Sequence, residues 1–92
     1  MPKRYSRHPD VRLTELEGEG VVLHLGTRTY FSLNETGLVL FNALEARRSL
    51  DDLVELLLDE YDVDHAEAKE TASEFLRDCE EAGLLQFHED GQ

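Results

Sequence analysis

The sequence predicts a single α+β domain, in which a three-stranded antiparallel sheet is followed by three helices. Apolar residues alternate with a period of two over roughly the first third of the chain, between turns that contain glycine. From residue 35 onward they recur with the 3.6-residue period of amphipathic helices, in three segments that each follow a capping residue. The length of 92 residues leaves room for one hydrophobic core.

Two strands are expected after an irregular start. Residues 1–10 contain both prolines and three of the nine basic residues, which predicts a flexible lead-in. Strands over 11–16 and 21–25 then pair across a turn in which Gly18 and Gly20 supply positive φ angles. In the second strand, the side chains expected to face the core are Val21, Leu23 and Leu25, with His24 on the opposite face.

The third strand, over 28–33, leads directly into the first helix. Its expected inward side chains are Thr29, Phe31 and Leu33. Asn34 is a favourable N-cap, and Glu35 then faces the positive end of the helix dipole. A helix is therefore predicted over 35–46, and a close contact at Gly37 would explain a glycine in its first turn.

Two further helices are predicted from their capping signals. Ser49 is followed after three residues by Asp52, and Asp64 is followed by Glu67 at the same spacing. The third helix is expected to end near residue 82, because Gly83 is a favourable C-terminal stop. The apolar stripes of the three helices are Leu38, Leu40, Phe41 and Leu44; Leu50, Leu53, Val54, Leu57 and Tyr61; and Ala68, Ala72, Phe75, Leu76 and Cys79. A short extended piece over 84–87 closes the domain at 11–87, and 88–92 are expected to be a tail.

Composition and charge exclude several classes of function. The net charge of −12 argues against binding to nucleic acid or to anionic membranes, because both need clustered Lys and Arg. No apolar run approaches the roughly 20 residues of a membrane span, and the N-terminus lacks the apolar segment of a signal peptide. These features predict a cytoplasmic protein, and the single cysteine excludes an internal disulfide.

No catalytic, cofactor or metal site is predicted. The four histidines, His8, His24, His65 and His88, form no pair at the spacing of a helical metal site. Cys79 falls on the apolar stripe of the third helix, where a core role is expected. The acidic segment 59–64 lacks the glycine and terminal glutamate of a calcium-binding EF-hand loop. The chain is therefore not expected to be an enzyme.

The order of the elements and five short segments resemble the PqqD family, the recognition elements that bind leader peptides of ribosomally synthesised and post-translationally modified peptides. The central segment is 30–37 (YFSLNETG), and it is followed by 49–53 (SLDDL), 60–64 (EYDVD), 75–76 (FL) and 83–85 (GLL). The resemblance spans about 11–87. One departure lies after Gly37, where many relatives carry an aromatic such as Trp and this chain has Leu-Val-Leu-Phe.

The resemblance implies a winged-helix-like fold and a way of binding. A precursor's leader peptide would add as a strand beside the third strand, in the groove between that strand and the third helix. The protein would present the precursor to a separate modifying enzyme, such as a radical SAM enzyme, a leader protease as in lasso peptide pathways, or a cyclase. The expected peptide-binding residues are Arg28, Thr29, Tyr30, Phe31, Ser32, Leu33, Thr71, Glu74, Phe75, Arg77, Asp78 and Glu81, with Leu76 beside Phe75.

Other interpretations remain open from the sequence. Phe31, Phe75 and Leu76 also fit plain core positions, and an unprotected strand edge could instead pair two copies of the chain into a homodimer. A small acidic docking subunit would use the same surfaces without any leader peptide. A winged-helix nucleic-acid binder is disfavoured, because 69–81 has two basic residues against five acidic ones.

Overall fold

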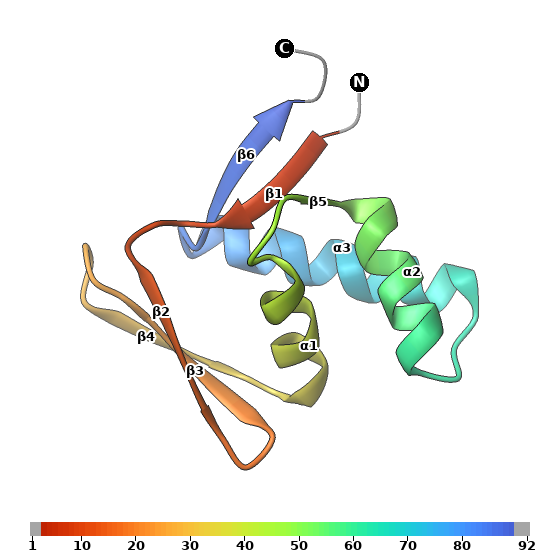
Figure 1. Ribbon diagram of the computed structural model, residues 1–92, viewed down its shortest axis with the longest axis horizontal. Helices are drawn as coiled ribbons and strands as arrows, with labels where there is room; N and C mark the ends of the chain where they lie inside the picture. Colours follow the sequence, from red (N-terminus) through yellow and green to blue (C-terminus); the bar gives the residue numbers. More distant parts are fainter. Residues whose placement is uncertain (1–2, 90–92) are drawn as a thin grey trace.

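The computed structural model describes residues 3–89, which form three α-helices and two three-stranded antiparallel sheets (Figure 1). The first sheet has the order β2-β3-β4, built from β2 (Val11–Leu16), β3 (Glu19–His24) and β4 (Thr29–Leu33). The helices are α1 (Glu35–Ala43), α2 (Leu50–Glu60) and α3 (His65–Glu81). The predicted α+β class and the order of sheet before helices are confirmed.

The second sheet was not predicted as a sheet, although its strand β6 includes most of the extended piece expected over 84–87. It has the order β5-β1-β6, built from β1 (Lys3–Arg7), β5 (Arg48–Ser49) and β6 (Leu85–Glu89). Figure 1 shows β1 and β6, at opposite ends of the chain, running side by side above the helices.

The expected irregular lead-in is therefore wrong for the described residues, as is the tail at residues 88 and 89. Lys3 pairs with Glu89, and the register continues to Arg7 opposite Leu85. The rings of Tyr5 and Phe87 meet edge-on with centroids 5.5 Å apart. The sequence of β1 has little apolar alternation, so the strand depends on a partner some eighty residues away. Residues 90–92 of the expected tail lie outside the described residues.

The predicted inward face of the second strand is also wrong. Val22 and His24 are buried, whereas Val21 and Leu25 are 37% and 45% exposed. The reason is the register, in which Val22 lies opposite Leu13 and therefore shares its face.

A histidine can occupy a buried position in β3 because its ring holds the following turn. His24 Nδ1 accepts hydrogen bonds from the backbone amides of Gly26 and Thr27, at 3.1 and 3.3 Å. The amide of Arg28 donates to the His24 carbonyl at 2.7 Å, and Arg28 has a positive φ of 58°. His24 therefore anchors the turn that starts β4.

The three helix starts agree with their predicted caps. Asn34 accepts from the Gly37 amide at 2.8 Å, and Ser49 and Asp52 form a reciprocal capping box. Asp64 accepts from the Glu67 amide at 2.8 Å. Helix α1 ends at Ala43, three residues before the predicted end at 46, and the chain then turns into β5.

Gly37 lies close to the side chain that caps the helix. A Cβ atom there would lie 3.2 Å from Asn34 Oδ1, so the cap would have to move by a few tenths of an ångström to admit it. The glycine thus leaves room for the Asn34 side chain to cap α1.

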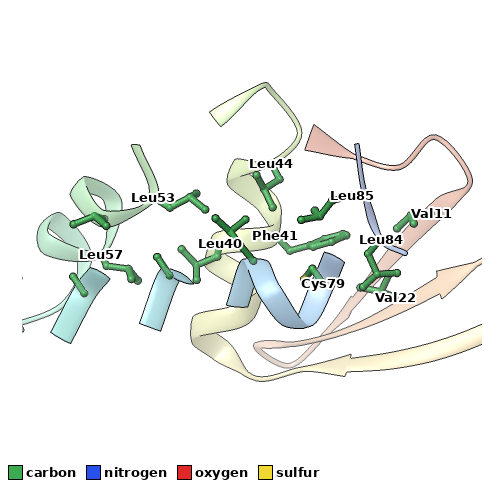
Figure 2. Close-up of a cluster of buried hydrophobic side chains, with 14 residues drawn as sticks. Val11, Val22, Leu40, Phe41, Leu44, Leu53, Leu57, Cys79, Leu84 and Leu85 are labelled. Atoms are coloured by element: carbon green, nitrogen blue, oxygen red, sulfur yellow. The ribbon is translucent and has the colours of Figure 1, made fainter. Parts of the chain in front are cut away.

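The core lies between α1, the other two helices and the strand residues that face them (Figure 2). Leu40 and Phe41 of α1 and its C-cap residue Leu44 have at most 1% of their surface exposed and form the centre of the core. The predicted helix stripes supply most of the remaining core, which confirms the 3.6-residue pattern.

Candidate functional site

Strand β4 forms one edge of its sheet. It pairs with β3 from Leu33 opposite Gly20 to Thr29 opposite His24, and within residues 3–89 its other side pairs with no strand. An edge strand presents a row of backbone donors and acceptors that can pair with another extended chain. The predicted open edge is therefore present.

A hollow of about 240 Å³ lies between this edge and α3. On the strand side it is bordered by Phe31, Ser32 and Leu33, and the α3 wall includes the half-buried ring of Phe75 and the carboxylate of Asp78. The other lining residues are Asn34, Gly37, Cys79, Ala82 and Leu84. We refer to this hollow together with the free edge of β4 as the groove.

The structure brings five of the predicted site residues to the hollow and places the others around it. Tyr30 is 71% exposed and points to the opposite face of the sheet from Phe31, because neighbouring side chains alternate along a strand. Arg28 and Thr29 are exposed at the start of β4. Leu76 is buried in the core, as the alternative interpretation expected, whereas Phe31 and Phe75 are only half-buried.

The remaining predicted residues of α3 do not line the hollow. Glu74, Arg77 and Glu81 are exposed on the helix, and Thr71 lines a separate hollow one turn before Phe75.

Sequence reasoning missed part of the groove lining. Cys79 and Ala82 could have been predicted as lining residues from the sequence, because they lie four and seven residues after Phe75 and therefore on the same side of the helix. Gly37 was predicted only as a close contact in the first helix and Leu84 only as part of an extended piece, because their position in the groove depends on the tertiary packing of α1 and of the segment after α3.

The electrostatic character of α3 beside the groove is acidic. Five carboxylates recur every three or four residues along the helix, and they are Glu67, Glu70, Glu74, Asp78 and Glu81. Burial raises the pKa of the Cys79 thiol to about 12, and the nearby Asp78 charge adds to this. The one thiol at the groove is therefore protonated at neutral pH and is a poor nucleophile.

Larger hollows among the described residues lack the groove's combination of features, including one of about 290 Å³ that is lined by Lys3, Tyr5, Ser49, Leu50 and Asp51. One of about 280 Å³ beside α2 is lined largely by charged side chains, including Arg48, Asp52 and Glu55, and lies away from β4. Another of about 450 Å³ opens by the β2–β3 hairpin and borders the groove at 32–34. Within residues 3–89 no three potential metal ligands gather, and no helix there is long and apolar enough to cross a membrane.

Comparison with known proteins identifies similar sequences and structures. The family model described as coenzyme PQQ synthesis protein D (PqqD) matches residues 19–85. The structure described as TbiB1 in complex with the TbiA(beta) leader peptide is 29% identical, with a TM-score of 0.81, covering 95% of this chain and 96% of that one. A lasso peptide synthetase B1 complexed with the leader peptide is 21% identical, with a TM-score of 0.78 and coverages of 89% and 96%. No curated protein matches the chain.

Proposed function

Since the PqqD model matches most of its length, the chain belongs to the PqqD family, and we propose that it recognises the leader peptide of a ribosomally synthesised, post-translationally modified peptide. The observation that carries this proposal is the free edge of β4, which lies beside a wall of α3 that contains Phe75, Asp78 and Cys79. A relative with 29% identity over nearly the whole chain is described in complex with a leader peptide, which supports the same role.

The proposed mechanism is strand addition. The leader extends the sheet by pairing with the outer edge of β4, so that its backbone replaces water on amides and carbonyls of Thr29–Leu33. Each such hydrogen bond contributes on the order of 1 kcal/mol net. The backbone provides affinity without much sequence preference, so selectivity comes from the side chains around the strand.

We assign a role in leader binding to the side chains that surround the groove. Phe31 and Phe75 form apolar walls for a leader side chain that points inward, and Leu33 closes one end. Asp78 at the rim favours a basic leader residue, while Arg28 at the start of β4 favours an acidic one. Exposed pairs of this kind contribute only about 0–1 kcal/mol each, so the apolar walls dominate.

The protein acts in this proposal as a non-catalytic adaptor. It holds the precursor while a separate cytoplasmic enzyme modifies it, and that enzyme is a radical SAM protein, a leader protease or a cyclase. The raised pKa of Cys79 supports a role outside catalysis, because the groove then contains no activated thiol. The acidic α3 is equally unsuited to nucleic acid, whose phosphates it would repel.

Isothermal titration with a synthetic leader peptide tests this function. The probe is the leader of the precursor encoded beside the gene, and a scrambled peptide of the same composition is the control. We expect saturable binding at micromolar or tighter affinity for the leader alone. A folded protein that binds neither peptide would instead favour a docking subunit, and a concentration-dependent dimer would favour pairing of two β4 edges.

A further inference from the structure

A second apolar hollow lies beyond the end of β4. It encloses about 200 Å³ between the start of α1, the end of α2 and the first half of α3. Leu57 is buried within it, and Tyr61 and Val63 form half-buried walls. The remaining lining residues are Thr36, Glu67, Ala68 and Thr71. Both this hollow and the groove are smaller than the roughly 300–1,000 Å³ of sites for drug-sized molecules, so each suits a single side chain better than a whole ligand.

The second hollow continues the line of the groove along α3. Residues on one face of a helix recur every three or four positions, and Glu67, Thr71, Phe75, Asp78 and Ala82 follow that spacing. The first two line the second hollow and the last three line the groove.

The first turn of α1 borders both hollows. Gly37 lines the groove, and its neighbour Thr36 lines the second hollow. In Figure 1 the chain leaves β4 at that turn, and β4 offers no further backbone edge beyond Leu33. A peptide that follows the groove past this point is held by side chains alone.

The spacing between the two hollows follows from helix geometry. Their α3 residues are centred about ten positions apart, which corresponds to about 15 Å at ~1.5 Å per residue. An extended peptide covers that distance in about four to five residues at ~3.3 Å each.

We propose that the second hollow is an additional anchoring site for the same leader peptide, a proposal that rests on the function given above. It takes an apolar side chain about four to five residues from the one held in the groove. Burying that side chain against Leu57, Tyr61 and Val63 makes recognition depend on the spacing of two apolar residues, and not only on one short strand.

Methyl-resolved NMR separates this inference from the function on which it rests. The probe is the same synthetic leader, titrated into the full-length chain with labelled Leu, Val, Ala and Thr methyl groups. Leu33 and Ala82 report on the groove, and Val63, Ala68 and Thr71 report on the second hollow. We expect both sets to shift at the same peptide concentrations. Shifts at the groove alone overturn the second anchor and leave the function intact, whereas no shift at any labelled methyl group overturns the function as well.

A pair of variants tests the energetic contribution. Val63→Asp puts a carboxylate into the second hollow, and we expect it to weaken leader binding roughly tenfold. Leu58→Asp is the matched control, because Leu58 is an exposed apolar residue of α2 that lines neither hollow. Equal affinities of the two folded variants would contradict the proposal.

Leaders altered on the peptide side provide a test that does not depend on how the variants fold. Replacing the second apolar residue by Ser, or inserting two glycines between the two anchors, should weaken binding by a similar factor. Unchanged affinity in both cases would contradict the second anchor.

Discussion

Phe75→Ala is the substitution that most directly probes the apolar wall of the groove. The ring is half-buried, packs with one side against the core and lines the hollow with the other. Removing it takes away the surface on which an inward-pointing leader side chain would rest, and leaves the backbone edge of β4 unchanged.

The expected loss follows from the area that the ring still exposes. A buried aromatic side chain covers about 150–250 Å², and Phe75 exposes well under half of its surface, so on the order of 50 Å² is left for a ligand. With a similar area on the peptide, ~100 Å² at ~25 cal/mol/Å² gives about 2.5 kcal/mol as an upper limit. Ordering the peptide offsets part of this, so we expect a loss of roughly tenfold in affinity.

The assay is isothermal titration of the leader into the wild-type chain, Phe75→Ala and Phe87→Ala. Phe87 provides a matched control, because it is 44% exposed on β6 and lines no part of the groove. Thermal melts identify any variant that has lost its fold. Folded Phe75→Ala that binds as tightly as the wild type, or an equal loss of affinity in Phe87→Ala, would contradict a role of the Phe75 ring in leader binding.

Four further outcomes are expected. Asn34→Ala removes the cap of α1 and should lower the free energy of unfolding by about 1 kcal/mol, with a melting temperature about 4–8 °C lower; an unchanged melt would show that the cap contributes little. The hydrogen bond from the Ser49 amide lowers the pKa of the Asp52 carboxyl, so the stability it contributes is present above the unfolded-state pKa and is lost as the pH falls through the folded-state pKa. Asp52→Asn should therefore flatten the acid side of the stability profile measured by urea unfolding, and an identical profile would contradict this role. Cys79, with its pKa raised to about 12, should react with a thiol reagent at pH 8 only after denaturant is added, and rapid reaction of the native protein would disagree with its burial. Binding of a basic leader should weaken as salt is raised, because the acidic side chains of α3 are exposed; an affinity independent of salt would assign that charge to solubility alone.

Local signals in the sequence predicted most of the helical part of the fold. The caps at Asn34, Ser49 and Asp64 are short-range features, since each hydrogen bond joins residues three apart. The stripes of the helices were also readable, because burial on one helix face repeats every 3.6 residues. These elements depend little on the rest of the chain.

Long-range pairing accounts for what the sequence did not predict. Strands β1 and β6 lie at opposite ends of the chain, and β1 carries charged residues where an isolated strand would show apolar alternation. The buried face of β3 was predicted wrongly because the glycine-rich turn is compatible with two registers, which differ by one residue and bury opposite faces of the strand. The pairing of Leu13 with Val22 selects the register that buries Val22.

The candidate site was predictable to a similar degree. The edge of β4 and the Phe75 stripe follow from local pattern and element order. The contribution of Gly37, the segment after α3 and the second hollow near Val63 required the packing of helices that are distant in sequence. The resemblance to the PqqD family supplied the pairing of strand and helix that the residues alone left open.

In the proposed complex, the leader peptide is an additional strand of the sheet, paired with β4. Intermolecular NOEs between the backbone protons of a labelled leader and those of Thr29–Leu33 measure this directly. We expect cross-strand NOEs at every second residue of β4, together with slower hydrogen exchange of its outward amides in the complex. Tight binding with no such NOEs and unchanged exchange in β4 would contradict strand addition and place the peptide elsewhere on the protein.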